Sequence, residues 1–406
     1  MRAKSSSSVL LVGGGIGGMA AALALARLGL SVELLEQSAT IGEIGAGLQL
    51  GHNAFAALDA LGVGEAVRSK AVFTERLVMM DAVDCSEVAS VEVGEDFRAR
   101  FRNPYAVSHR ADLHGAIFDA VQQHPGIRFH TSAAVEHLEI GDGGVHATTR
   151  DGRHFSASAV VGCDGVKSVV RAQLLGDAPR VSGHVVYRAV VPAERMPVDL
   201  RWNAPVVWAG PDCHLVHYPL RDGEQYNLVV TFHSRDKEEW GVTEGSQEEV
   251  LSYFEGIHAR PRQLLRLPTS WRRWSTADRD PVEQWGRGPA TLLGDAAHPM
   301  MQYLAQGACM ALEDAVTLGA AVERCGGDLP HAFRLYEAAR VARTARVVLS
   351  VREMGRIYHA KGVERLVRNS LWTGRTQQRF YDAVEWLYAW RPEQCLDDAR
   401  ATGIEN

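Results

Sequence analysis

The fold of this chain is decided by the stretch Val9-Leu10-Leu11-Val12-Gly13-Gly14-Gly15-Ile16-Gly17-Gly18. Four apolar residues of the kind buried in parallel sheets lead directly into a glycine-rich turn. The residues that follow, Met19 to Leu28, are rich in Ala and Leu, and Gly29 is placed to end a helix there. Ser31 to Glu36 then alternates as a second strand does. The pattern predicts a β-α-β unit of the Rossmann type.

Each glycine of the Gly13-x-Gly15-x-x-Gly18 pattern has a physical purpose in such a unit. The first permits a tight turn, the second lets a pyrophosphate approach the backbone, and the third lets the helix pack closely on the sheet. Glu36 follows the second strand, where it can accept hydrogen bonds from an adenosine ribose. We therefore predict a dinucleotide site, although this motif alone does not separate FAD from NAD.

Farther along the chain, strand and helix patterns alternate and then change to consecutive strands. Between about residues 185 and 232 the pattern is strand after strand, with a turn at Arg221-Asp222-Gly223. A buried strand at 290–293 and a helical stretch at 308–323 then return to the first type. We predict an α/β protein in three parts. Residues 1–75, 100–180 and 285–330 form a nucleotide-binding domain, residues 76–99 and 181–284 an interleaved, mostly β substrate domain, and residues 331–406 a helical C-terminal segment.

Composition narrows the classes of function. The chain has 406 residues, 46% of them hydrophobic and 23% charged, and a net charge of −6, which does not favour nucleic-acid binding. Its six cysteines are scattered without a C-x-x-C pair, so neither a disulfide framework nor a zinc site is indicated. Residues 5–26 carry no charge, but five glycines interrupt them, which argues against a membrane span or a signal peptide. Residues 5–8 are expected to be a loose N-terminus. We expect a cytoplasmic protein.

Two further motifs follow buried strands, and they specify the nucleotide. The first is Gly162-Cys163-Asp164-Gly165 with its continuation to Arg171, and the second is Gly294-Asp295-Ala296-Ala297-His298-Pro299. With the first glycine turn, they stand in the order and spacing of the single-component flavoprotein aromatic hydroxylases, which the chain resembles over nearly its whole length. The resemblance implies the para-hydroxybenzoate hydroxylase-like fold, non-covalently bound FAD, NADH as a transient co-substrate and O2.

The resemblance also implies which residues touch FAD. Asp295 at a strand end can accept from the ribityl hydroxyls, and the helix that begins at Gly307 and Ala308 points its positive N-terminus toward the flavin ring. Arg110 matches a position on the phosphate side, where an ordinary surface arginine is the open alternative. The other residues implied to bind the cofactor are Gln49, Val135 near the adenine, Asp164 and Gly165.

The substrate side resembles the salicylate and hydroxybenzoate branch of the family. The segments 45–53 and 305–308 carry that resemblance. Within the branch it implies hydroxylation of 3-hydroxybenzoate para to its hydroxyl, giving gentisate, by way of a flavin C4a-hydroperoxide. In Cys213 to Pro219, His214 and Tyr218 fall on one face of a strand and His217 on the other. Gln302 stands where many relatives carry proline, and its amide can both donate and accept.

Attack on such an oxidant is favoured when the substrate's phenol is ionised. A phenol has a pKa near ~10 and histidine one near ~6.5, so full proton transfer would cost about 4.8 kcal/mol unless the site stabilises the phenolate. We therefore propose His214 as the base or hydrogen-bond partner of the phenol, with Tyr218 and Gln302 orienting it. A satisfied strand histidine and a core tyrosine are the structural alternative. Arg188 is a candidate for the substrate carboxylate, and an arginine on a sheet surface is an equally open interpretation.

Several other functions compete with this interpretation. Salicylate 1-hydroxylation and 6-hydroxynicotinate 3-monooxygenation are alternatives within the family, and a non-catalytic flavoprotein is the alternative outside it. A halogenase would show a W-x-W signature that this sequence lacks. The two later motifs disfavour an NAD-dependent dehydrogenase, and His214-x-x-His217 has diverging faces and no third ligand for a metal.

The C-terminal segment is rich in arginine. Residues 331–380 hold eleven Arg or Lys against three Glu, several arginines lying at helical intervals. Three interpretations stay open: a solvated helix face, the contact of a homodimer, and a site for acidic phospholipid.

Overall fold

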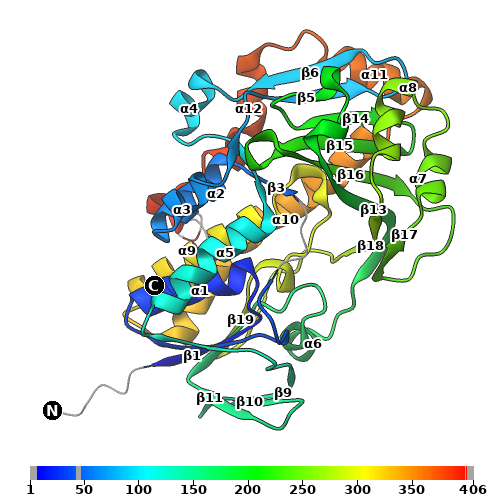
Figure 1. Cartoon of the computed structure of the whole chain (residues 1–406). Helices are drawn as coiled ribbons and strands as arrows, with labels where there is room; N and C mark the ends of the chain where they lie inside the picture. The colour runs from blue at the N-terminus through cyan, green and yellow to red at the C-terminus, as the bar shows by residue number, and fades with distance from the viewer. Residues whose placement is uncertain (1–6, 43–46, 142, 398, 400–406) are drawn as a thin grey trace.

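The computed structural model of the chain describes residues 7–42, 47–141, 143–397 and 399. Gly45 and Ala46 of the predicted substrate-branch motif, Asp142 of a predicted turn, and part of the expected loose N-terminus lie outside the described residues. Within them, strands and helices alternate over the first third of the chain and consecutive strands dominate the middle. The last part is helical (Figure 1).

A five-stranded sheet contains the glycine-rich turn. Its strand order is β19 (Ala290–Leu292), β12 (Ala159–Gly162), β1 (Ser8–Val12), β2 (Ser31–Leu35) and β8 (Ile127–His130). All neighbouring strands run parallel, as expected where helical crossovers connect them. The predicted β-α-β unit is therefore confirmed, with α1 (Ile16–Arg27) joining β1 to β2.

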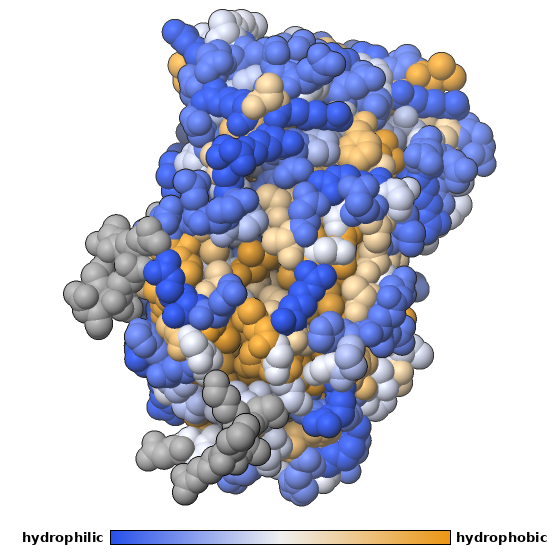
Figure 2. All heavy atoms as spheres, turned by 90° about the vertical axis from the view of Figure 1, so that its left-hand side faces the viewer, coloured by the Kyte–Doolittle hydropathy of each residue, from blue (hydrophilic) through white to orange (hydrophobic). Residues whose placement is uncertain are grey.

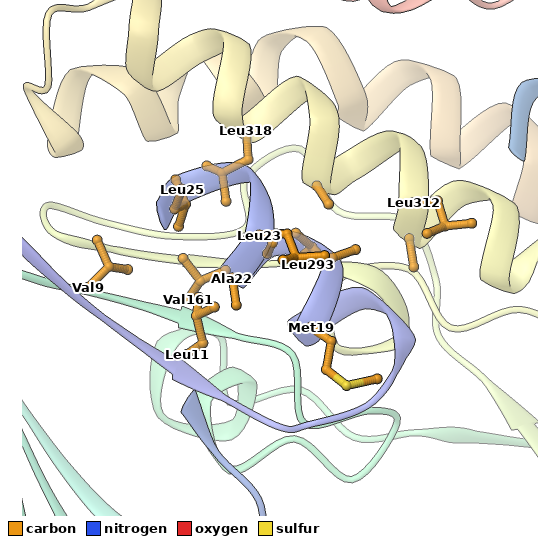
Figure 3. Close-up of a cluster of buried hydrophobic side chains, with 14 of the residues drawn as sticks. Val9, Leu11, Met19, Ala22, Leu23, Leu25, Val161, Leu293, Leu312 and Leu318 are labelled. Carbon is orange, nitrogen blue, oxygen red and sulfur yellow. The ribbon is translucent and has the colours of Figure 1, made fainter. Parts of the chain in front are cut away.

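Helices and a smaller sheet cover the two faces of this parallel sheet. One face carries α1, α5 (Arg110–Gln123) and α9 (Gly307–Arg324). The other contacts an antiparallel sheet of β11 (His154–Ala157), β10 (Gly144–Thr149) and β9 (Val135–Gly141). Figure 3 shows the core between sheet and helices, where Leu11 and Val161 from the strands approach Ala22 of α1, with Leu312 and Leu318 of α9 above. Burying such side chains stabilises the domain by about 1.5–3 kcal/mol each.

The mostly β part is an eight-stranded sheet, seen in the upper half of Figure 1. Its order is β17 (Gly241–Gly245), β18 (Trp271–Asp278), β13 (Arg180–Pro192), β16 (Gln225–His233), β15 (Cys213–Leu220), β14 (Val206–Gly210), β5 (Arg76–Asp81) and β6 (Glu87–Glu92). β5 and β6 precede the rest of the sheet by more than 80 residues, so the sheet is assembled from two distant segments. The division into three parts stays our proposal for the domain boundaries.

The two faces of this eight-stranded sheet pack against different elements. Because side chains alternate along a strand, Leu215 points into an apolar core beneath α7 (Gln247–Tyr253) and α8 (Ala259–Arg262), whereas Val216 belongs to a second cluster on the opposite face. That opposite face looks toward β7 (Ala106–His109), which pairs with β3 (Gly47–Leu50) and β4 (Val72–Phe73). Because of the alternation, one face of the sheet packs into the core of this part, and the other face lies at the boundary between the two parts.

The remaining elements connect and cover these sheets. They are α2 (His52–Ala60), α3 (Gly64–Arg68), α4 (Glu95–Phe101), α6 (Val169–Leu174), α10 (Leu329–Tyr358), α11 (Gly362–Trp372), α12 (Gln377–Tyr388), and the 3-10 turns η1 (Ala193–Arg195), η2 (Val198–Leu200), η3 (Arg221–Gly223), η4 (Gln263–Arg266), η5 (Gly294–Ala296), η6 (Gln302–Leu304) and η7 (Pro392–Gln394). Within the described ranges, no helix combines the length and hydropathy that crossing a bilayer demands.

The arginine-rich segment corrects one expectation. Arg340 of α10 is fully buried and donates to Glu313 at 2.5 Å and to Asp314 at 2.7 Å, both on α9. Arg343 donates to the same Glu313, and Arg352 pairs with Asp278 of β18. None of the three open interpretations describes these arginines. They sit inside the molecule because the carboxylates of α9 and β18 need counter-charges once buried.

Candidate active site

One large cavity, of about 870 Å³, lies between the parallel sheet and the eight-stranded sheet. Its walls come from the glycine-rich turn, from β3, from the inner face of β15, from the start of α9 and from the C-terminal helices. A cavity of this size and mixed lining is typical of cofactor and substrate sites. The predicted residues that line it are Gly15, Gln49, Arg110, Gly165, Asp295, Gly307 and Ala308 on one side and His214, Tyr218 and Gln302 on the other.

The three glycines of the first motif differ in how closely other atoms surround them. Gly13 has a φ of +111°, and a Cβ there would lie 2.3 Å from the carbonyl oxygen of Cys163. A Cβ on Gly18 would lie 1.9 Å from the carbonyl oxygen of Gly13. A Cβ on Gly15 would meet nothing within 4 Å, because Gly15 faces the cavity. Two glycines are thus required by packing, and Gly15 leaves the backbone open to a ligand.

Glu36 and Val135 lie beside the turn without lining the cavity. Glu36 accepts from the amide of Gly14 at 2.8 Å and from that of Ser38 at 2.7 Å, so its carboxylate braces the turn. Val135 is buried in the core, two residues after Ala133, whose amide donates to the carbonyl of Glu36. Both residues therefore lie beside the turn, and their contacts with an adenosine stay predictions.

In the second motif, Asp164 and Gly165 differ in position. The Asp164 carboxylate accepts from the Ser168 hydroxyl and from the amide of Val169 at 2.7 Å, so it caps the start of α6. Gly165, with a φ of +74°, lines the cavity. The aspartate therefore holds the loop, and the glycine presents it to the ligand space.

In the third motif, Asp295 faces the cavity. Among the described residues nothing donates a hydrogen bond to its carboxylate, and a Cβ on Gly307 would lie 3.9 Å from it. Removal from bulk water raises the pKa of Asp295, whereas the nearby His298 and Arg110 oppose that shift. An acceptor left open in this way can bind hydroxyl groups. The backbone N–H groups at the start of α9, Gly307 and Ala308, have no side-chain cap and border the same space.

Gln49 and Arg110 complete this side. Gln49 on β3 accepts from the Tyr105 hydroxyl at 2.7 Å, which leaves its amide nitrogen as a donor beside the cavity. Arg110 is the exposed first residue of α5, at the cavity wall. A pyrophosphate requires donors, which backbone amides and a guanidinium supply here. A ribityl chain also requires an acceptor, which the carboxylate of Asp295 supplies. The residues present fit FAD.

On the substrate side, His214 and Tyr218 share the cavity face of β15, as predicted. His214 is 1% exposed, and its Nδ1 lies 2.8 Å from Nε2 of His359. Burial, with a smaller contribution from His184, lowers the pKa of His214 to about 3, so the imidazole is neutral. The ring of Tyr218 packs against Gly47, where a Cβ would lie 2.8 Å from the tyrosine hydroxyl. Burial raises the pKa of Tyr218, so its hydroxyl stays protonated and can donate.

His217 points to the other face, as predicted. Its ring accepts from the indole N–H of Trp208 at 3.3 Å and lies 3.2 Å from the carbonyl of Leu200. The described residues contain no group of three or more His, Cys, Asp or Glu that could hold a metal ion. His217 is therefore a satisfied core histidine.

Gln302 lines the cavity at the start of η6, and its Nε2 donates to the Thr231 hydroxyl on β16 at 2.9 Å. The amide oxygen is then left for a ligand donor. Arg188 of β13 reaches the same cavity. Its guanidinium lies 5.7 Å from the Trp274 ring centroid and has no ion-pair partner among the described residues. Burial lowers the pKa of this arginine, the effect expected where a cation is desolvated without a counter-charge.

A family model described as FAD binding domain matches residues 6–348. The chain belongs to this family of FAD-binding proteins. A relative from Klebsiella oxytoca named 3-hydroxybenzoate 6-hydroxylase is 62% identical over 96% of this chain and 98% of its own. Another so named, from Polaromonas naphthalenivorans, is 61% identical over 96% and 97%. A solved structure titled salicylate hydroxylase substrate complex has a TM-score of 0.83 at 25% identity over 98% of both chains. The predicted fold class and the FAD cofactor are confirmed.

Some residues of this FAD-binding hydroxylase were missed from sequence. Arg171, at the end of the second motif, is buried and donates to the carbonyls of Ala296 and Ala297, so it ties the second motif to the third. His298 of the third motif lies 2.6 Å from Asp314. Both stand inside quoted motifs, which could have marked them. His359 lies 145 residues from His214, and no local pattern indicates it.

Proposed function

We propose that this enzyme uses FAD, NADH and O2 to hydroxylate 3-hydroxybenzoate para to its hydroxyl, giving gentisate. The observation that carries the proposal is the shared cavity: the residues that fit FAD and the phenol-directed trio His214, Tyr218 and Gln302 border the same space. Similarity to two proteins named 3-hydroxybenzoate 6-hydroxylase supports the choice of substrate. The flavin supplies the reduction of O2 and the oxygen transfer.

The chain's own residues would prepare the ring for attack. Neutral His214 can accept a hydrogen bond from the substrate hydroxyl through Nε2, since its Nδ1 is taken by His359. The Tyr218 hydroxyl can donate to the resulting phenolate, and the Gln302 oxygen can accept from a neighbouring donor. Hydrogen bonds to the charged form lower a phenol's pKa. The trio therefore favours ionisation through hydrogen bonds from side chains that are themselves uncharged.

We further propose Arg188 as the anchor of the substrate carboxylate. Its guanidinium borders the cavity on the same sheet face as Tyr218 and lacks an anionic partner among the described residues. A bidentate carboxylate would supply the missing counter-charge. We keep twelve residues as the proposed binding set for FAD, with NADH binding transiently from outside: Gly13, Gly15, Gly18, Glu36, Gln49, Arg110, Val135, Asp164, Gly165, Asp295, Gly307 and Ala308.

The test is an assay of NADH oxidation with product identification. The substrates are 3-hydroxybenzoate, salicylate, 4-hydroxybenzoate and 6-hydroxynicotinate. Gentisate from the first with little turnover of the others supports the proposal. Catechol from salicylate, or turnover of 6-hydroxynicotinate, would replace the substrate, and a bound flavin with no phenol-stimulated NADH oxidation would indicate a non-catalytic flavoprotein. His214→Ala should divert NADH oxidation into peroxide.

We also propose a homodimer formed through α11. Val363, Leu366, Val367 and Leu371 lie along this helix and are 51–75% exposed. Figure 2 shows a different part of the surface, the side at the left of Figure 1, where apolar side chains gather in the middle between hydrophilic ones. Acidic phospholipid is a weaker occupant of α11, because Arg365 and Arg368 are already paired with Asp81. Light scattering of Leu366→Asp should show monomers, whereas an unchanged dimer or lipid-dependent binding would count against this interface.

We also propose that the enzyme works in the cytoplasm.

A further inference from the structure

His214 has a second histidine behind it, joined by a single hydrogen bond. We propose that His359 positions His214 and relays the proton of the substrate's phenol from the cavity to solvent. The inference rests on the proposed function, since it extends the task given there to His214. His359 ends the long helix α10, whereas His214 lies on β15, so the tertiary fold alone brings them together.

The geometry places the pair between the cavity and the outside. His214 lines the cavity and is 1% exposed, whereas His359 does not line it and is partly exposed. The Nδ1 of His214 lies 2.8 Å from Nε2 of His359, so one of these nitrogens donates and the other accepts. For His214 to accept a proton at Nε2, its Nδ1 must be the donor. The hydrogen bond to His359 then fixes both the tautomer and the ring orientation.

The electrostatics favour passing a proton over holding one. Burial lowers the pKa of His214 to about 3, and burial together with neighbouring histidines lowers that of His359 well below its ordinary value. The substrate's phenol has a pKa near ~10, and protonated His214 has one about seven units lower, so transfer to His214 is strongly unfavourable. Release of the proton to bulk water at pH 8 has to overcome a difference of only about two pKa units. A route outward is therefore far more favourable than storage on His214.

The transfer balances at every atom. The phenol O–H bond breaks as an N–H bond forms at Nε2 of His214. The Nδ1–H bond of His214 breaks as one forms at Nε2 of His359, and the Nδ1–H of His359 passes its proton to water. Once the ring has been hydroxylated, the reverse sequence reprotonates the product's phenolate and restores both tautomers.

Other polar groups surround the pair. The ring of His359 stacks on His184 of β13, at 5.4 Å between centroids and 11° between planes. His184 is bonded to the Tyr303 hydroxyl. The remaining titratable neighbours are His233 of β16 next to His184, Tyr358 next to His214, and the exposed pair Asp212–Lys361, of which the Asp212 amide donates to the His359 carbonyl. None of these side chains forms a hydrogen bond with either nitrogen of the His214–His359 contact among the described residues.

Two variants separate relay from orientation. Glutamine in His359→Gln can still accept from Nδ1–H of His214 but cannot pass a proton on, and His359→Phe removes both abilities. The oxidised, FAD-loaded enzyme is mixed with 3-hydroxybenzoate in weak buffer containing a pH indicator dye. We expect proton release with the wild type, release at least ten-fold slower with His359→Gln, and recovery when imidazole is added. His359→Phe should also divert NADH oxidation into peroxide.

The control is His233→Gln, an exposed histidine of the same cluster without a bond to His214. It should release protons at the wild-type rate. Flavin absorbance and thermal unfolding verify that each variant is folded. Wild-type release from His359→Gln would overturn the relay, and full coupling in His359→Phe would overturn the positioning. A wild type that neither binds nor hydroxylates 3-hydroxybenzoate would overturn the proposed function, and with it the relay.

Discussion

The amide of Gln302 is fixed by Thr231: Nε2 donates to the threonine Oγ1 across 2.9 Å. The two residues belong to η6, in the segment after the parallel sheet, and to β16 of the eight-stranded sheet. The bond therefore joins the two parts of the enzyme at the cavity and leaves the amide oxygen of Gln302 without this partner.

Removing the Thr231 hydroxyl should disturb this arrangement. Thr231→Val keeps the shape but leaves the Gln302 amide free to turn, so we expect kcat/KM for 3-hydroxybenzoate to fall about ten-fold, the effect of one hydrogen bond of about 1–1.5 kcal/mol. Peroxide formed per NADH oxidised should rise. Thr231→Ser retains the hydroxyl and serves as the control. Equal kinetics for Val and Ser would show that the bond does not orient Gln302.

The glycine-rich turn permits a comparison of two neighbouring alanines. Gly15→Ala adds a methyl group that meets no protein atom and points into the cavity, so the chain should fold but retain little FAD. Gly18→Ala would place its Cβ 1.9 Å from the Gly13 carbonyl oxygen, so we expect this variant to be less stable toward thermal unfolding. Flavin absorbance per chain and thermal unfolding separate the outcomes. Full flavin content in Gly15→Ala would mean that the pyrophosphate lies elsewhere.

The buried ion pairs of Arg340 should dominate the stability of the C-terminal segment. Arg340→Ala leaves the carboxylates of Glu313 and Asp314 with less compensation, and we expect unfolding free energy to fall by about 3–5 kcal/mol. Arg356→Ala, whose partner Glu353 is exposed on the same helix, should cost at most about 1 kcal/mol. Chemical denaturation measures both. Similar losses for the two variants would contradict this ranking.

Stability should fall on mild acidification. His52 is 1% exposed among Phe97, Phe101 and Tyr388, and burial lowers its pKa from 6.5 to about 3. Below pH 6.5, His52 therefore binds a proton in the unfolded chain but stays neutral in the folded chain. The stabilisation present above pH 6.5 is lost as the pH falls from there toward 3. Between pH 7 and pH 5 this group alone should cost about 2 kcal/mol. His52→Phe should reduce that slope, and an unchanged slope would assign it to other groups.

Arg188 can be tested by a pair of substrates. Arg188→Met should raise KM for 3-hydroxybenzoate about ten- to hundred-fold, since an ionic hydrogen bond contributes about 1.5–3 kcal/mol. Arg188→Lys should be affected less. An analogue that carries a neutral hydroxymethyl group in place of the carboxylate provides the control, because its KM should not change. Equal losses for both substrates would give Arg188 a role away from the carboxylate.

Local sequence sufficed for the nucleotide half of this enzyme. The turn after β1, the Asp164-Gly165 loop and the Gly294-Asp295 loop each depend on residues within a few positions, so their spacing predicts their geometry. The alternation along β15 likewise placed His214 and Tyr218 on one face and His217 on the other. Periodicity carries that information because successive side chains of a strand point in opposite directions.

Long-range contacts decided the rest. Arginines at helical intervals describe a solvated face equally well as a buried one, and only the carboxylates of α9 and β18 show which arginines turn inward. The pairing of His214 with His359 and of Gln302 with Thr231 joins residues 145 and 71 positions apart. The sequence motifs thus indicated the cofactor and the class of chemistry through their resemblance to the flavoprotein hydroxylases, and residues close together in the chain define the geometry of these motifs. The tertiary structure determined which charges are buried and which nitrogens face the cavity, because burial and hydrogen-bond partners exist only after distant segments have packed.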